Sequence, residues 1–162
     1  MTKELILRRR LHVLTWLFIA GLLVSGITAI PLPAEVGWLL DHFHGNSQPA
    51  TLSAWLQRVH NALMQTEAER PFLFYGTDWL AFGHFMIALV FVGVLRDPVR
   101  NRWLFDFGLM ACALVIPYAL IMGGWRGIPF WWRLIDCSFG IFGAVPLWYC
   151  RRWAIELERR DN

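Results

Sequence analysis

The most constraining feature of this sequence is the run Val13–Leu32, twenty residues without a charged side chain. A helix of that length rises roughly 30 Å, which matches the hydrocarbon thickness of a bilayer. Small residues recur in the run at four-residue spacing, at Gly21, Ser25 and Ala29. Such spacing lets a second helix approach closely. The run therefore predicts a membrane span, which we place at about residues 12–32.

Three further apolar runs predict spans at about residues 78–95, 104–125 and 132–150. The chain is 57% hydrophobic, and long runs with few charges are typical of membrane proteins. Gly140, Gly143 and Ala144 give the last run a small packing face. We expect an all-α membrane protein in which four antiparallel transmembrane helices form a single domain over residues 1–162.

The segment 33–77 is too polar to span a membrane. Within it, apolar residues repeat at helical spacing with polar residues between them, at Leu52, Trp55, Leu56, Val59 and Leu63. This pattern predicts an amphipathic helix in the first outer loop. It lies either on the membrane surface or as a cap packed over the mouth of the bundle.

Basic residues set the predicted orientation. Eleven of them flank the apolar runs on one side, including a short polar tail after residue 150: Lys3, Arg8, Arg9, Arg10, Arg96, Arg100, Arg102, Arg151, Arg152, Arg159 and Arg160. The other side carries four: Arg58, Arg70, Arg126 and Arg133. By the positive-inside rule, both termini are expected in the cytoplasm.

The net charge of +3 does not indicate a nucleic-acid partner, because the basic residues form short clusters beside apolar runs and no nucleic-acid motif is present. The three cysteines form no C-x-x-C pair and favour no disulfide framework. The expected partners are the lipid bilayer, and either other membrane subunits or further copies of the chain.

Polar side chains inside the predicted spans are the candidates for a site. His84 and Asp136 are each about six residues from the outer end of their spans, so they should lie at similar depth. An ionisable group in a span requires a partner and is a functional hypothesis by default. The predicted outer-leaflet cluster comprises Tyr75, Asp78, His84, Tyr118, Arg126, Arg133 and Asp136.

Three interpretations of this cluster remain open. It is a ligand or substrate site, a proton relay, or a structural ion-pair network that fixes helix register. In the structural interpretation, Arg133 and Asp136 lie three residues apart and satisfy each other locally.

Four histidines are weak candidates for a metal site: His42, His44, His60 and His84. Neither a helical His-x-x-x-His pair nor a cysteine ligand supports such a site. The alternative is that these are ordinary loop histidines.

Three segments resemble parts of a group of small, uncharacterised bacterial membrane proteins: YGTDW at 75–79, RDPVRN at 96–101 and RGIPFWWRLIDCSFG at 126–140. The resemblance covers roughly residues 52–152. It implies a bacterial inner-membrane protein and no known activity.

The first span is also similar to that of four-helix b-type cytochrome subunits, through Arg9-Arg10-Leu11-His12, Trp16 and Ser25-Gly26. Those proteins bind haem between histidines of different helices. This sequence departs from the pattern, because His12 is expected near the inner surface and His84 in the outer leaflet.

Two function classes follow. The first is a multi-pass inner-membrane protein of the binding or accessory class, with a polar outer-leaflet site between the second and fourth spans. The alternative is a small membrane enzyme or redox subunit, using b-type haem or quinone, at that site. The sequence specifies no cofactor.

Overall fold

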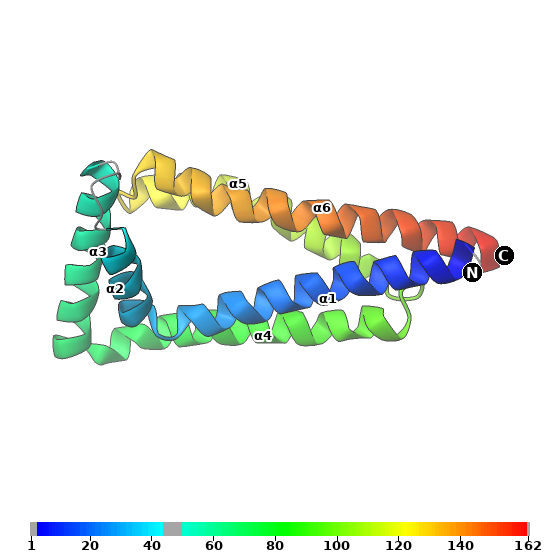
Figure 1. The fold of residues 1–162 in the computed structure, drawn as a ribbon, viewed down its shortest axis with the longest axis horizontal. Helices are drawn as coiled ribbons and strands as arrows, with labels where there is room; N and C mark the ends of the chain where they lie inside the picture. The colour runs from blue at the N-terminus through cyan, green and yellow to red at the C-terminus, as the bar shows by residue number, and fades with distance from the viewer. Residues whose placement is uncertain (1–2, 44–49, 162) are drawn as a thin grey trace. The chain divides into compact units, whose positions relative to one another are not determined.

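A computed structural model describes residues 3–43 and 50–161 of the chain. Within these ranges every regular element is helical (Figure 1). In chain order the elements are α1 (Lys3–Ala29), α2 (Leu32–His42), α3 (Ala50–Glu69), the 3-10 helix η1 (Pro71–Phe74), α4 (Tyr75–Arg96), α5 (Trp103–Trp125) and α6 (Phe130–Asp161). The all-α prediction is confirmed.

The prediction of four transmembrane helices is wrong. Over the described ranges, three helical stretches are long and apolar enough to cross a membrane: Lys3–Ala29, Pro71–Arg96 and Trp103–Trp125. The longer helix α6 does not belong to this group. Its apolar part contains Asp136 and Pro146 and is bounded by Arg133 and Arg151, which lowers its hydropathy. The three apolar helices support a membrane protein.

Contacts divide the chain into two compact units. One, called here the loop unit, comprises residues 22–87, and therefore the end of α1, then α2, α3, η1 and the first part of α4. The other, called the hairpin unit, comprises the chain up to residue 21 together with residues from 88 onward. It holds the first part of α1, the end of α4, and all of α5 and α6.

In the loop unit, the segment predicted to hold one or two surface helices forms two helices and a 3-10 turn. The amphipathic helix is α3, and it packs against α2. Val36 and Leu40 of α2 and Leu56 of α3 are buried. The His60 imidazole lies against α2, where a Cβ added at Gly37 would be 3.2 Å from Nε2. The apolar stripe of α3 therefore packs at least in part on protein.

The close approach of α1 to α4 in the loop unit is at Gly26. A Cβ added there would lie 2.5 Å from a ring carbon of Phe85 and 3.1 Å from the Ala81 carbonyl oxygen. By contrast, a Cβ at Gly21 would meet nothing within 4 Å among the described residues. The four-residue spacing in α1 thus predicted a small-residue contact but missed the glycine that makes it.

In the hairpin unit, α5 and α6 pack side by side (Figure 1). At Gly140 an added Cβ would lie 2.5 Å from the Cys112 carbonyl oxygen and 2.6 Å from Val115 Cγ1. At Gly143 it would lie 3.0 Å from Cys112 Sγ. The predicted small face of α6 is confirmed at these two glycines.

A glycine turn joins α5 to α6. Gly127 has φ of +70°, a conformation that costs L-residues with a side chain roughly 1–2 kcal/mol. The Ile128 amide donates to the Gly123 carbonyl at 2.8 Å, and the Gly127 amide donates to the Gly124 carbonyl at 3.2 Å. These two bonds form a Schellman motif, which satisfies carbonyls that the end of α5 would otherwise leave unpaired.

The last ten residues of α6 do not form a polar tail. The helix continues to Asp161, and Ala154 and Leu157 are fully buried. Other fully buried side chains of the hairpin unit are Leu11 of α1, Phe91 of α4 and Phe105 of α5. Polar residues on the exposed face of this helix end concealed its buried stripe in the sequence.

Candidate functional site

The seven residues of the predicted outer-leaflet cluster are divided between the two units. Tyr75, Asp78 and His84 belong to the loop unit, whereas the other four belong to the hairpin unit: Tyr118, Arg126, Arg133 and Asp136. The cluster as a whole stays a prediction.

In the loop unit, Tyr75 and Asp78 line one pocket of about 240 Å³ together with Trp79 and Phe82. The Trp79 ring meets Tyr75 edge-on at 5.9 Å between centroids, and Phe82 at 5.5 Å. All four side chains come from the first two turns of α4. A row of exposed aromatic rings at the start of an apolar helix is typical of an interface anchor.

Arg133 has a structural role at the turn between α5 and α6. Its Nε donates to the Ile128 carbonyl at 3.0 Å, and a terminal nitrogen donates to the Leu120 carbonyl at 3.2 Å. Its aliphatic stem fills the notch at Gly123, where an added Cβ would be 2.6 Å away. A cation at a helix C-terminus is favoured by the helix dipole and by the unpaired carbonyls there.

The expected local pair between Arg133 and Asp136 is not formed within the described residues, because the guanidinium is directed at backbone carbonyls. Asp136 is half-buried, and the described part of the chain supplies it with neither an ion pair nor a hydrogen bond. Arg126 is exposed, with its guanidinium carbon 5.8 Å from the Trp125 ring centroid. Tyr118 is also exposed.

The histidines have separate surroundings. His42 stacks on Trp38 at 5.3 Å between ring centroids, and His60 packs at Gly37. His84 Nδ1 lies 2.8 Å from the Leu80 carbonyl oxygen, and His44 lies outside the described residues. Across the residues that the structure describes, no three His, Cys, Asp or Glu side chains form a group that could hold a metal ion.

His12, one of the residues in the similarity to b-type cytochrome subunits, joins α1 to α4 in the hairpin unit. Its Nδ1 lies 2.7 Å from the Arg8 carbonyl oxygen, and its Nε2 lies 3.0 Å from the Leu95 carbonyl oxygen. A neutral ring can donate to only one of these acceptors. Both nitrogens are thus directed at backbone, which favours a packing role over haem ligation.

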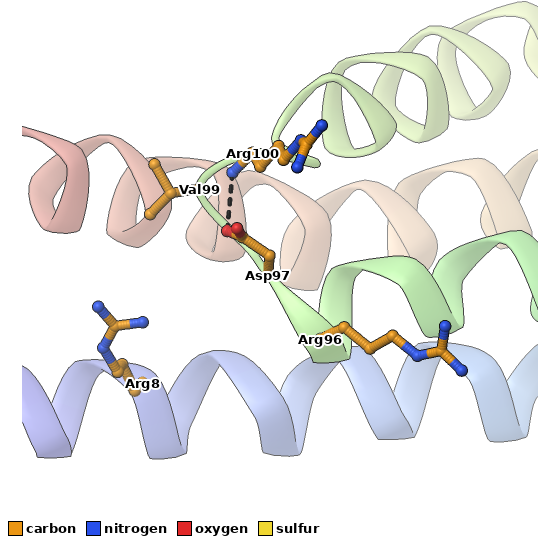
Figure 2. Close-up of a pocket in the computed structure, with 5 residues that line it drawn as sticks. All are labelled: Arg8, Arg96, Asp97, Val99 and Arg100. Carbon is orange, nitrogen blue, oxygen red and sulfur yellow. Dashed lines mark hydrogen bonds between the residues drawn. The ribbon is translucent and has the colours of Figure 1, made fainter.

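The hairpin unit has a strongly basic pocket that the sequence analysis missed. Its volume is about 390 Å³, and it is lined by Arg8 of α1 and by Arg96, Asp97, Val99 and Arg100 at and after the end of α4. Figure 2 shows Arg8 extending from α1 toward the turn, whereas the side chains of Arg96 and Arg100 extend in the direction away from Arg8. Three arginines and one aspartate line the pocket, and of the three arginines Arg8 is paired with Glu4, so the positive charge of the pocket comes mainly from Arg96 and Arg100.

The turn that carries two of these arginines is held by its own polar groups. The Arg100 amide donates to Asp97 Oδ1 at 2.9 Å (Figure 2). The Asn101 side-chain amide donates to the Gly93 and Asp97 carbonyls, both at 3.0 Å. The Asp97 carboxylate therefore contributes to turn geometry, and the arginine side chains on either side of it are directed outward.

Within the described ranges, the acidic residues near the pocket form ion pairs, and only Glu4 pairs with an arginine of the pocket, Arg8. Asp106 bonds Arg151, and Glu158 bonds Arg102. Glu156 is 3.8 Å from Lys3 and 2.7 Å from Arg160, and Glu4 is 2.9 Å from Arg8. These contacts join the start of α1, the 97–102 turn and the end of α6, together called here the charged end. Arg96 and Arg100 have no acidic partner among the described residues.

Such an arrangement can bind an anion. Guanidinium groups present several N–H donors that match phosphate oxygens, and they keep their charge at any physiological pH. The sequence did contain these arginines, but only as charges that set orientation. The sequence could not show that the nearby acidic residues Glu156, Glu158 and Asp106 pair with side chains other than Arg96 and Arg100.

No protein-family model, curated protein sequence or solved structure matches the chain.

Proposed function

We propose that this chain is a multi-pass membrane protein of the binding or accessory class, and that its charged end binds phosphate-bearing anions at the membrane surface. The observation that carries this proposal is the basic pocket, in which Arg96 and Arg100 have no acidic partner among the described residues. Clusters of Lys and Arg directly beside an apolar helix are typical sites for anionic headgroups.

The membrane proposed is the bacterial inner membrane, with the charged end in the cytoplasm. The resemblance of segments 75–79, 96–101 and 126–140 to small bacterial membrane proteins supports the first part. The excess of basic residues supports the second. Ion pairs of Lys3 and Arg102 with the end of α6 support a common side for both termini and the 97–102 turn.

The path of α6 along α5 also supports this common side. It packs along α5 from Arg133, near the end of α5, to Arg151, which pairs with Asp106 near its start. This antiparallel path brings the end of α6 back to the start of α5, although α6 has a lower hydropathy than the three apolar helices.

Orientation is tested with reporter fusions. Fusions at the C-terminus and within residues 97–102 should report a cytoplasmic location, whereas a fusion at position 46 should report the periplasm. A periplasmic signal from the C-terminal fusion would refute the proposed orientation.

Anion binding is tested by thermal unfolding of the purified protein in detergent. The probes are inorganic phosphate and dihexanoyl phosphatidylglycerol, with dihexanoyl phosphatidylcholine as the zwitterionic control. A ligand that binds the folded state raises the unfolding midpoint. A rise with phosphate identifies free phosphate as sufficient, and a rise with phosphatidylglycerol alone identifies the lipid headgroup.

The deciding variant is Arg96→Gln with Arg100→Gln. Both side chains are exposed, so the free energy of unfolding without ligand should change by less than about 0.5 kcal/mol. Two basic groups at about 1 kcal/mol each correspond to a roughly 30-fold loss of affinity. The control, Arg58→Gln with Arg70→Gln, removes the same charge from exposed positions of the loop unit and should bind like the parent. Equal binding by all three proteins would reject the proposal.

A further inference from the structure

A second pocket of the hairpin unit, separate from the basic pocket, combines charge with an apolar wall. Its volume is about 360 Å³, and it is lined by Ile6, Arg9, Arg10, Val13, Leu14 and Trp153. Five of these residues are on α1, and the sixth comes from α6. We refer to this pocket as the α1 groove.

The polar and apolar parts of the α1 groove follow one another along the helix. Val13 and Leu14 are about one turn beyond Arg9 and Arg10, so the apolar wall begins where the guanidinium groups end. The run of residues without charge also begins at Val13. The groove therefore crosses from the basic start of α1 into its membrane-spanning part.

Aromatic side chains on α6 indicate where the membrane interface lies. Trp148 meets Tyr149 at 5.0 Å between ring centroids, and Tyr149 meets Trp153 at 5.8 Å. The Arg152 guanidinium carbon is 4.8 Å from the Trp148 ring centroid. Trp and Tyr gather at headgroup level in membrane proteins. Trp153 belongs to this row, so the groove that it lines opens at the boundary between headgroups and acyl chains.

The charge of the α1 groove is not neutralised within the described residues. Arg9 and Arg10 are exposed and have no acidic partner there, whereas the adjacent Arg8 pairs with Glu4. A second copy of this chain is a poor occupant, because it would bring four arginines together. A purely polar anion would leave the wall of Val13, Leu14 and Trp153 uncovered.

We infer that the α1 groove is a binding site for one anionic phospholipid. Arg9 and Arg10 bind its phosphate through charge-assisted hydrogen bonds, and Val13, Leu14 and Trp153 hold the first part of an acyl chain. The inference rests on the proposed function and extends it from phosphate-bearing anions at the basic pocket to a phospholipid in the α1 groove. Neither Arg96 nor Arg100 lines the α1 groove, so the groove can be tested independently of the basic pocket.

The test uses native mass spectrometry of the full chain, released from nanodiscs of phosphatidylcholine with a minor fraction of phosphatidylglycerol. The parent protein should retain one phosphatidylglycerol in preference to phosphatidylcholine. Phosphatidylglycerol with a diazirine in its acyl chain should label the peptides that contain residues 13–14 and 153. Inorganic phosphate in excess should not displace the lipid.

Two variants separate the parts of the site. Arg9→Gln with Arg10→Gln removes the cations and should lower retention of the lipid roughly 30-fold. Leu14→Trp fills the groove without a change of charge and should also abolish retention. Circular dichroism checks that both variants keep their helices, and Arg9→Lys with Arg10→Lys preserves charge if the glutamine variant fails to insert. In that case the lysine variant should retain the lipid less well than the parent, because lysine cannot form the bidentate bonds.

The variant Arg96→Gln with Arg100→Gln should retain the lipid like the parent. Retention by Leu14→Trp would show that only the headgroup is recognised and would overturn the inference. The inference would also be overturned if the variant Arg9→Gln with Arg10→Gln retained the lipid. Labelling spread evenly over all apolar helices would overturn it too, as would a dimer that Leu14→Trp dissociates. Loss of lipid in the Arg96 and Arg100 variant alone would support the proposed function and reject the α1 groove.

Discussion

Two places in the hairpin unit use arginine in opposite ways. At the turn between α5 and α6, Arg133 is bound by the Ile128 and Leu120 carbonyls and lies in a notch made by glycine. At the charged end, Arg96 and Arg100 have no acidic partner among the described residues.

The difference comes from the backbone beneath each side chain. The end of α5 supplies carbonyls that a helix cannot pair internally, so an arginine nearby becomes part of the cap. The backbone of the 97–102 turn is already paired with the side chains of Asp97 and Asn101, so Arg96 and Arg100 remain available. An arginine in a sequence motif is thus a candidate for ligand binding only when the local backbone does not need it.

The largest expected effect on stability concerns the contact between α5 and α6, the two helices that the Arg133 turn connects. Gly140→Leu would place side-chain atoms on the Cys112 carbonyl and the Val115 side chain, so it should lower the free energy of unfolding by about 3 kcal/mol. The measurement is thermal unfolding in detergent, followed by circular dichroism. Gly21→Leu is the matched control, because an added Cβ there meets nothing within 4 Å. Equal midpoints for the two variants would contradict the packing of α5 on α6.

An intermediate effect is expected from the cap itself. Arg133→Gln removes two hydrogen bonds from a charged donor and should destabilise the protein by about 2 kcal/mol. Arg126→Gln, seven residues earlier, removes the same charge from an exposed side chain and should have little effect. If denaturation curves showed a larger loss of stability for Arg126→Gln than for Arg133→Gln, Arg133 would not be part of the helix cap. The contrast between Arg133 and the arginines of the charged end would then be wrong.

The smallest effect is expected at Gly127. Ala at φ of +70° is strained although space is open around it, so Gly127→Ala should cost about 1 kcal/mol. Gly76→Ala, in the open helical position of α4, should be neutral or slightly stabilising. Chemical denaturation can resolve this difference, and a stable Gly127→Ala protein would argue against the Schellman motif.

The helices themselves were predictable because apolar runs of this length have few alternatives. The error over α6 came from counting its run 134–150 as apolar, although Asp136 and Pro146 within that run lower its mean hydropathy. The buried stripe of Ala154 and Leu157 was missed because the segment that holds it is rich in arginine and glutamate. Periodicity over so short a segment is a weak signal.

The site was less predictable than the fold. Matched depth grouped His84 with Asp136, but depth along a helix does not say which way a side chain points or which unit it joins. The basic pocket depends on residues about ninety positions apart, Arg8 and Arg96 to Arg100. Its availability also depends on the pairing of Glu156 and Glu158 elsewhere, which no local pattern encodes.

The hydrogen-bonded backbone of the 97–102 turn should slow both amide exchange and proteolysis of this segment. The amides of Asp97, Arg100, Asn101 and Arg102 each donate a hydrogen bond. Such amides exchange with solvent deuterium only when the turn opens, and a protease needs the same opening to cut after Arg96, Arg100 or Arg102. A surface segment with three tryptic sites should therefore persist under digestion for as long as the turn is closed, and a bound anion should lengthen that period.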